Sequence, residues 1–292
     1  MAEAALHGLS VDLEAWYHPE LVRPHLGGLA GAPGVRQALA PLRALLGQAG
    51  ARATFFVVGE LLAGHADLLQ ELQAEGHEIG CHGWSHRTLW ELGESGLREE
   101  LQRFREEEAR LGLESAVGFR APTFSLDAGT CWAVPLLAEQ GFRYDSSVFP
   151  LRGPLYGVAG APLCAYRPQP GDLTRAGSDG PLWELPPTVA CLGPWRAPVA
   201  GGAYLRLLPF PLLRWLLRRA AAEGRPLVLY LHPWEMHRET PRVALPLLTR
   251  WITYGGQGAA LGRVARLLQD YRFAPLGQVL GLWAPTAWEV PL

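Results

Sequence analysis

The sequence predicts an α/β fold, either a (β/α) barrel or a wound parallel sheet. Short apolar segments that fit strands alternate along the chain with longer amphipathic segments that fit helices, an order that implies parallel strand pairing. Polar side chains also stand at or just beyond the carboxyl ends of the predicted strands, which gather at one face in folds of this class. The sequence shows no internal repeat, and we expect a single domain over residues 1–292.

The first half of the chain predicts four strands with helices after them. LSVDLEA alternates strictly between apolar and polar residues, which is typical of a strand with one buried face. The helix before the third strand has leucines along one side and is followed by Gly76, a residue suited to a helix C-cap. The predicted strands are 9–15, 53–59, 77–81 and 117–120, and the predicted helices are 34–48, 60–75, 94–111 and 127–140.

The second half continues this alternation after an interruption. Residues 150–180 are rich in glycine and proline, so we expect a long surface loop there. The apolar run PLVLYLH predicts a buried strand further on. The predicted strands are 142–149, 182–190 and 226–232, and the predicted helices are 204–223 and 243–268.

Composition and charge limit the classes of function that this protein could have. Apolar residues make up 49% of the chain, enough to fill a sizeable core, and the four cysteines have no metal-ligand spacing. The formal net charge of −2 argues against nucleic acid or an anionic membrane surface as the main partner. No run of about 18 apolar residues is present, so we expect no transmembrane segment. The N-terminus lacks the basic and apolar regions of a signal peptide, and we expect a soluble cytoplasmic protein.

Two histidines four residues apart, His82 and His86, follow the predicted strand HEIGC. Such a pair is often one incidental turn of helix and by itself indicates little. Asp12 and Glu14 lie two apart on the first strand, so their side chains project to the same side. Two imidazoles and one carboxylate, with a position left for water, form the pattern of a catalytic divalent-metal site. With His232 at a third strand end, the metal interpretation is favoured over the incidental one.

Three further residues at strand ends admit two interpretations each. His232 could be a satisfied core histidine or a general acid. Arg120 could be an ordinary surface arginine, or it could pair with a carboxylate and hold it ionised. Cys81 could be a thiol nucleophile, but a cysteine that closes a strand is more often a small buried apolar group, which we favour. The other histidines have no convergent partner and are interpreted as surface or structural residues: His7, His18, His25, His65, His77 and His237.

Six motifs occur in a fixed order along the chain: SVDLEAW, ATFFVVGE, GHEIGCHGWSH, GFRAPTFS, FRYDSSVFP and LYLHPWE. This ordered set resembles the polysaccharide deacetylases of the NodB-homology group, carbohydrate esterase family 4, over about residues 8–280. It matches best a subgroup found with exosortase/PEP-CTERM exopolysaccharide loci, and about residues 225–285 contain the segment that resembles that subgroup's C-terminal extension. The resemblance implies an α/β fold that is a distorted (β/α) barrel of about seven parallel strands.

The resemblance also implies a metal centre and a general base. Carried over position by position, Glu14, His82 and His86 would hold the metal. Asp12 would be the general base, and Arg120 would tether it. The family's usual adjacent Asp-Asp is here Asp-Leu-Glu, so the metal carboxylate comes one residue later and is one methylene longer.

Three further roles follow from the same resemblance. His232 would be the general acid, with Asp145 as the partner that orients it. The backbone N–H of Thr123 would donate to the oxyanion. The family's tyrosine at this position after the Arg-x-Pro motif is replaced by threonine, which alters the wall that faces the sugar.

The activity that the resemblance implies is removal of N-acetyl groups from N-acetylhexosamine units by a divalent metal, most often zinc, with cobalt, manganese, nickel or iron as other options. The expected partner is an N-acetylated oligosaccharide or polysaccharide, or a lipid-linked precursor. Two other functions stay open. The spaced acidic pair also occurs in relatives that hydrolyse cyclic imides or ureides, some of them without metal. A catalytically silent sugar-binding protein is the other alternative, and the full set of catalytic residues argues against it.

Overall fold

A curled sheet of eight strands forms the centre of the computed structural model, which describes residues 5–27 and 34–283. The strand order is β11-β1-β2-β3-β4-β5-β8, with β12 added beside β1, and every pair in this sheet is parallel. Thr188, after β8, donates its backbone N–H to Val228 O at 3.0 Å and so links the far edge of the sheet to β11. The distorted (β/α) barrel predicted from the sequence is confirmed. The strands are β1 (Leu6–Leu13), β2 (Thr54–Val57), β3 (Glu78–Cys81), β4 (Gly118–Phe119), β5 (Tyr144–Asp145), β8 (Trp183–Glu184), β11 (Val228–Leu231) and β12 (Arg272–Ala274).

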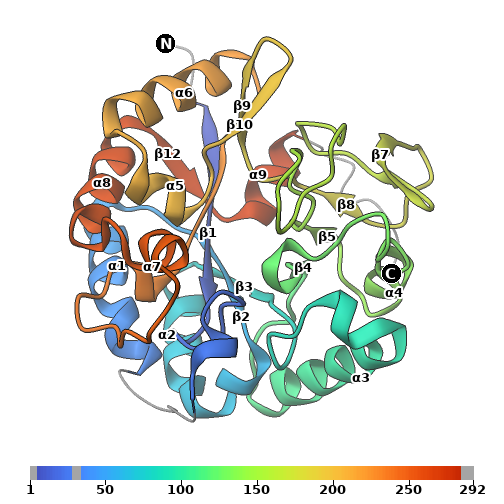
Figure 1. The fold of residues 1–292 in the computed structure, drawn as a ribbon. Helices are drawn as coiled ribbons and strands as arrows, with labels where there is room; N and C mark the ends of the chain where they lie inside the picture. Colours follow the sequence, from blue (N-terminus) through green and yellow to red (C-terminus); the bar gives the residue numbers. More distant parts are fainter. Residues whose placement is uncertain (1–4, 28–33, 284–292) are drawn as a thin grey trace.

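Helices surround the sheet (Figure 1). In α3, Thr88 Oγ1 accepts from the N–H of Glu91 while the Glu91 carboxylate accepts from the N–H of Thr88, a capping box that starts this helix five residues before the predicted position. Gly50 follows α1 in the left-handed conformation that favours glycine, at φ 60°. The helices of the first half are α1 (Val35–Ala49), α2 (Ala66–Ala74), α3 (Leu89–Arg110) and α4 (Ala133–Glu139).

In the second half of the chain, several helix boundaries of the structure differ from the predicted ones. The helix predicted at 204–223 is α5 (Gly202–Leu207) and α6 (Phe210–Ala222), because Pro209 stands between them and lacks the N–H that would continue the helix. The helix predicted at 243–268 is α7 (Leu247–Tyr254) and α8 (Gln257–Asp270), interrupted at Gly256, which has φ 72°.

Two small hairpins and two terminal elements were not predicted. Two consecutive prolines divide the strand predicted at 182–190, and its second part pairs antiparallel with a later segment. The predicted loop at 150–180 contains the other hairpin. The additional elements are β6 (Pro168–Gln169), β7 (Asp172–Ala176), β9 (Val189–Leu192), β10 (Trp195–Pro198), the strand β12 and the helix α9 (Leu276–Trp283).

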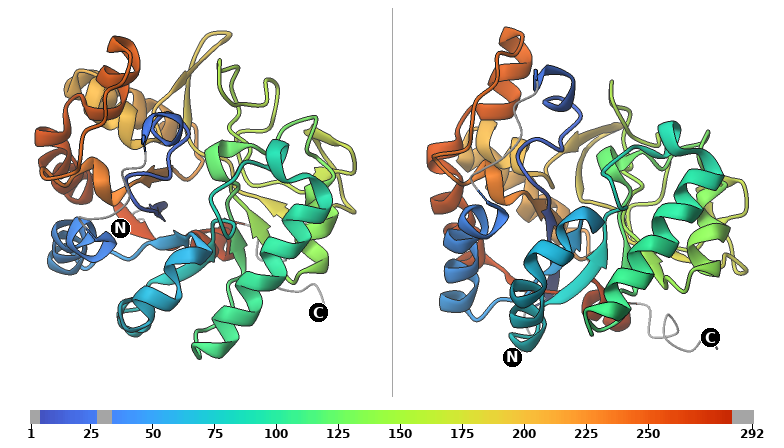
Figure 2. Two further views of the ribbon diagram at one scale, coloured as in Figure 1. Left: turned by 60° about the horizontal axis from the view of Figure 1, so that its bottom comes forward. Right: turned by 90° about the horizontal axis from the view of Figure 1, so that it is seen from below.

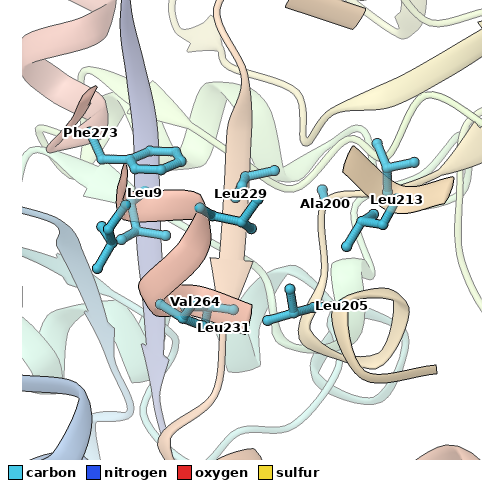
Figure 3. A pocket seen from close by; sticks show the side chains of 11 residues that line it. Leu9, Ala200, Leu205, Leu213, Leu229, Leu231, Val264 and Phe273 are labelled. Carbon is cyan, nitrogen blue, oxygen red and sulfur yellow. The ribbon is translucent and has the colours of Figure 1, made fainter. Parts of the chain in front are cut away.

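Apolar side chains fill both sides of the sheet. Figure 3 shows Leu9 and Leu229 of adjacent strands facing side chains such as Leu205 and Val264 from α5 and α8, around a remaining cavity of about 20 Å³. A separate cluster inside the curl includes Phe56. None of the helices in the described ranges has the length and apolar composition needed to cross a bilayer.

The segment after β1 covers one part of the mouth of the curl. Trp16 and Val22 from this segment pack with Trp234 and Val243 from the region after β11. Both views of Figure 2 show the dark blue segment beside the orange helices of the last third of the chain. The ends of the two neighbouring strands are thereby held together above the sheet.

Candidate metal centre and active site

Three buried side chains at the mouth could hold a metal ion. Glu14 follows β1, His82 follows β3, and His86 lies four residues further on, and one ligand atom from each falls within 4.8 Å of the others. His86 Nε2 is 2.6 Å from Glu14 Oε2. The sequence-predicted ligands therefore meet at one point in the fold.

The hydrogen bonds of this cluster suit a metal centre. His82 Nδ1 lies 2.8 Å from the carbonyl oxygen of Arg120, which can only accept, so Nδ1 carries the proton and Nε2 keeps its lone pair. The indole N–H of Trp234 donates to Glu14 Oε1 at 2.9 Å and fixes the carboxylate. Burial raises the pKa of Glu14, but the neighbouring histidines outweigh it and hold this pKa well below its usual range. A donor set of two imidazoles and a carboxylate fits zinc and similar divalent cations.

Asp12 is held by a completely buried arginine. Arg120 Nη1 donates to Asp12 Oδ1 at 2.7 Å and to Ser10 Oγ at 2.7 Å. The rest of the guanidinium donates to the backbone oxygen and to Oγ of Ser146, and it lies 4.3 Å from the centre of the Phe56 ring. The alternative of a surface arginine is wrong, because this side chain is fully buried and all three of its nitrogens donate inside the barrel.

His232 stands opposite the metal cluster and is partly open to solvent. Its Nε2 is 3.7 Å from Asp12 Oδ2 and also 3.7 Å from Glu14 Oε1, and its side chain is 20% exposed. Nδ1 pairs with Glu235 Oε2 at 3.1 Å. Burial opposes ionisation of this imidazole, but the Glu235 carboxylate outweighs it and, with Glu14 and Asp12, raises the pKa of His232 to about 9. A protonated His232 can donate from Nε2 into the site.

Glu235 is itself fixed by Arg206. Arg206 Nη2 and Nε donate to Glu235 Oε1 at 2.9 and 3.2 Å, and Arg206 also donates to the backbone oxygens of Ile252 and Gly255. Burial raises the pKa of Glu235, but Arg206 and His232 outweigh it and lower this pKa to about 2. The carboxylate therefore stays charged over the whole range in which His232 titrates.

The prediction that Asp145 orients His232 is wrong, since Glu235 occupies that position. Side chains alternate along a strand, and the neighbours of Asp145 on β5 face the interior of the barrel, so Asp145 faces away from it. Its Oδ1 accepts from Ser147 Oγ at 2.6 Å, and that hydroxyl accepts from the N–H of Ala121 at 2.7 Å. Asp145 thus supports the turn that carries Thr123 rather than the general acid.

Asp145 also lies beside Glu184, its partner in the register of β5 and β8. Burial raises the pKa of Asp145 despite the hydrogen bonds from Ser147. Burial and the charge of Asp145 raise the pKa of Glu184 well above its usual range. Two adjacent buried carboxyl groups cannot both ionise easily, so the pair retains a proton.

Thr123 and Phe124 line the cavity with unusual backbone angles. Their φ values are 57° and 51°, in the left-handed region that non-glycine residues seldom adopt. His86 shares this property, at φ 57°. Strained backbone of this kind costs about 1–3 kcal/mol per residue and gathers at functional sites.

The sequence interpretation missed His18 as a member of the site. His18 is buried, stacks on His86 with ring centres 5.5 Å apart, and accepts from the N–H of Ala15 at Nδ1. Nothing in the sequence around His18 indicates that it belongs to the site, so the sequence alone predicts a surface or structural residue. Glu235 could have been found, since it follows His232 by three residues within the motif HPWE.

The side chains described above border a cavity of about 520 Å³. Its polar floor is formed by the metal cluster, Asp12 and His232. Its walls are largely apolar, with Leu151, Leu155 and Tyr156 from the loop after β5 and Leu207 from α5. The space is much larger than an acetyl group and can accept a sugar ring.

A barrel mouth with a Glu-His-His cluster that could hold a metal, an Asp–Arg pair and a third histidine suits a hydrolase. Sequence comparison makes the class more specific. Residues 32–143 match the family model for polysaccharide deacetylase. Residues 146–281 match the model for a domain of unknown function, DUF3473. Residues 32–143 are therefore similar to polysaccharide deacetylases, and each of the two matches covers less than half of the chain.

Two curated proteins are similar to parts of this chain. A chitin deacetylase of Pestalotiopsis sp is 32% identical over 92 residues, 29% of this chain and 29% of the relative. An uncharacterized 30.6 kDa protein in the fumA 3'region of Geobacillus stearothermophilus is 35% identical over 71 residues, 24% of this chain and 27% of the relative. The aligned parts thus span less than a third of these curated relatives.

Solved structures show the same fold. A candidate polysaccharide deacetylase from Mycobacterium smegmatis has a TM-score of 0.58 and 22% identity, covering 96% of this chain and 91% of that one. The peptidoglycan deacetylase PdaC from Bacillus subtilis has a TM-score of 0.50 and 12% identity, covering 98% of this chain and 95% of that one.

Proposed function

We propose that this chain is a metal-dependent N-deacetylase that acts on N-acetylhexosamine units of a polysaccharide or of its precursor. The observation that supports this most is the meeting of Glu14, His82 and His86 beside two separate proton-transfer groups. We further propose that the chain belongs to the exosortase/PEP-CTERM-associated subgroup. The DUF3473 match over residues 146–281 includes most of the part that resembles that subgroup's C-terminal extension.

Glu14, His82 and His86 would hold the divalent cation, most often zinc. Such a cation supplies polarisation of the amide carbonyl and lowers the pKa of bound water toward about 7. Asp12, fixed by Arg120, accepts the proton of the attacking water. This carboxylate has the advantage that its orientation is set before substrate arrives.

The leaving nitrogen and the oxyanion need donors of their own. His232 in its protonated form delivers a proton to the leaving amine from Nε2, because Nδ1 is engaged with Glu235. The backbone N–H of Thr123 donates to the oxyanion, a contribution of about 3 kcal/mol for a well-placed donor. Acetate and a free amino sugar result.

Purified protein should contain a stoichiometric divalent metal and release acetate from N-acetylated oligosaccharides. Metal analysis combined with an acetate-release screen over such sugars tests this directly. Hydrolysis of a cyclic imide or ureide without acetate release would assign the barrel to the alternative amidohydrolase activity. A folded, metal-loaded protein that hydrolyses neither class would favour the catalytically silent alternative.

Glu235→Gln should move the basic limb of the kcat/KM profile to lower pH. The active form of His232 is the protonated one, so activity persists below its pKa and is lost above it. Removal of the Glu235 charge weakens a charge-assisted hydrogen bond worth about 1.5–3 kcal/mol, which corresponds to a shift of about 1–2 pH units. Glu239→Gln, an exposed change four residues on, serves as the control and should leave the limb in place. An unmoved limb in Glu235→Gln would mean that another group titrates.

A further inference from the structure

Helix α7 presents three large apolar side chains to solvent. Leu247, Leu248 and Trp251 are 78%, 68% and 55% exposed, and their spacing places them on one face of the helix. Thr253 and Tyr254 of the same helix are buried and anchor it to the protein. Adjoining apolar side chains at this level of exposure mark an interaction surface rather than ordinary protein surface.

This apolar face is continuous with the catalytic cavity. Trp251 lines the cavity as well as the outer face of α7. Leu155, which is 40% exposed, lines the same cavity from the loop after β5. Whatever covers α7 therefore lies at the entrance through which substrate reaches His232.

Positive charge predominates in the sequence around α7. Residues 236–251 contain Arg238, Arg242 and Arg250 but only one acidic residue, Glu239. The three arginines are exposed, and none of them takes part in the ion pairs found among residues 5–27 and 34–283. The net charge of −2 for the whole chain hides this local excess of positive charge.

Exposed leucine and tryptophan in a segment rich in exposed arginine form the combination that binds anionic bilayer surfaces. The apolar side chains enter the headgroup region, tryptophan settles at the interface, and the arginines pair with phosphates. A second copy of the chain packed on the same face would bring these arginines against their own counterparts. A soluble sugar chain would find no hydrogen-bonding groups on Leu247 and Leu248.

We propose that the face formed by Leu247, Leu248, Trp251 and Leu155 docks the protein on an anionic lipid bilayer. The catalytic cavity then opens at the bilayer surface, where glycans attached to lipid would be presented to it. The docking stands on the surface alone, whereas the lipid-linked substrate class rests on the proposed deacetylase function.

Co-sedimentation of the full chain with phosphatidylcholine vesicles, with and without phosphatidylglycerol, tests the docking. Wild type should bind the vesicles that contain phosphatidylglycerol, and added salt should weaken this binding. The double variant Leu247→Ser/Leu248→Ser should bind at least about tenfold more weakly, because the two largest exposed apolar contributions are lost. The control is Leu212→Ser/Trp215→Ser on α6, a pair of exposed apolar side chains that does not line the cavity and should bind as wild type does.

Three outcomes would overturn the docking. They are absence of wild-type binding, equal binding by the Leu247→Ser/Leu248→Ser variant, and an equal loss in the α6 control. Light scattering identifies the competing occupant: a wild-type dimer that the α7 variant converts to monomer, without vesicle binding by wild type, assigns the face to a second copy.

Acetate release from one N-acetylated oligosaccharide, supplied free or anchored to lipid in the same vesicles, tests the substrate class. Wild type should favour the anchored form, and Leu247→Ser/Leu248→Ser should lose that preference while hydrolysing the free form as wild type does. Equal rates of wild type on the two forms would overturn the lipid-linked substrate. Vesicle binding with no acetate release from either form would refute the deacetylase function and leave the docking surface in place.

Discussion

His82→Ala should remove the bound metal and with it nearly all activity, while the protein stays folded. His82 is one of three ligand candidates at the barrel mouth, and the apolar core lies elsewhere, in the layers around Phe56 and Leu9. Loss of one imidazole leaves a two-ligand site that cannot retain a divalent cation at ordinary concentrations. We expect activity to fall by at least about 10³-fold, since both polarisation of the carbonyl and activation of water depend on the ion.

Metal content by elemental analysis, thermal unfolding and acetate release should be measured on the same sample. The control is His25→Ala, which removes an exposed histidine outside the cluster and should change none of the three. Full metal occupancy in His82→Ala would show that the pair four residues apart is not the metal site.

Asp12→Asn should slow the reaction by about 10²–10⁴-fold, the usual contribution of a positioned general base. The amide keeps the shape of the side chain but cannot accept the proton. Metal occupancy should stay close to wild type, because Asp12 is not one of the three clustered ligand candidates and its Oδ1 is already engaged by Arg120.

Single-turnover rates and metal content separate the two roles that a carboxylate could have here. Asp67→Asn, which changes an exposed carboxylate paired with Arg36, provides the matched control. If Asp12→Asn purifies without metal, Asp12 is a ligand and Glu14 becomes the better candidate for the base.

Much of the site could be predicted because its residues lie at or near the ends of predicted strands. His82, Arg120 and His232 each follow an apolar stretch, and Asp12 lies near the end of the alternating strand β1. The parallel pairing of these strands brings their ends to one face. The pairing itself follows from the alternation of strand-like and helix-like segments. The order of strands and helices in the sequence is therefore enough to predict that these residues lie close together in the fold.

The parts that could not be predicted depend on contacts between distant segments. Arg206 joins Glu235 across 29 residues, and no local pattern marks Arg206 as its partner. The resemblance implies that Asp145 orients His232, but Asp145 binds Ser147 and the partner of His232 is Glu235. His18 reaches the metal cluster only because the segment after β1 folds back over the barrel mouth.

The paired carboxyl groups of Asp145 and Glu184 couple the stability of this protein to the proton concentration. Both have folded-state pKa values raised by burial, so between the ordinary and the raised values the folded protein keeps a proton that the unfolded chain gives up. Unfolding therefore releases a proton. The stabilisation from this pair is complete below the ordinary carboxyl pKa and diminishes as pH rises through the raised values.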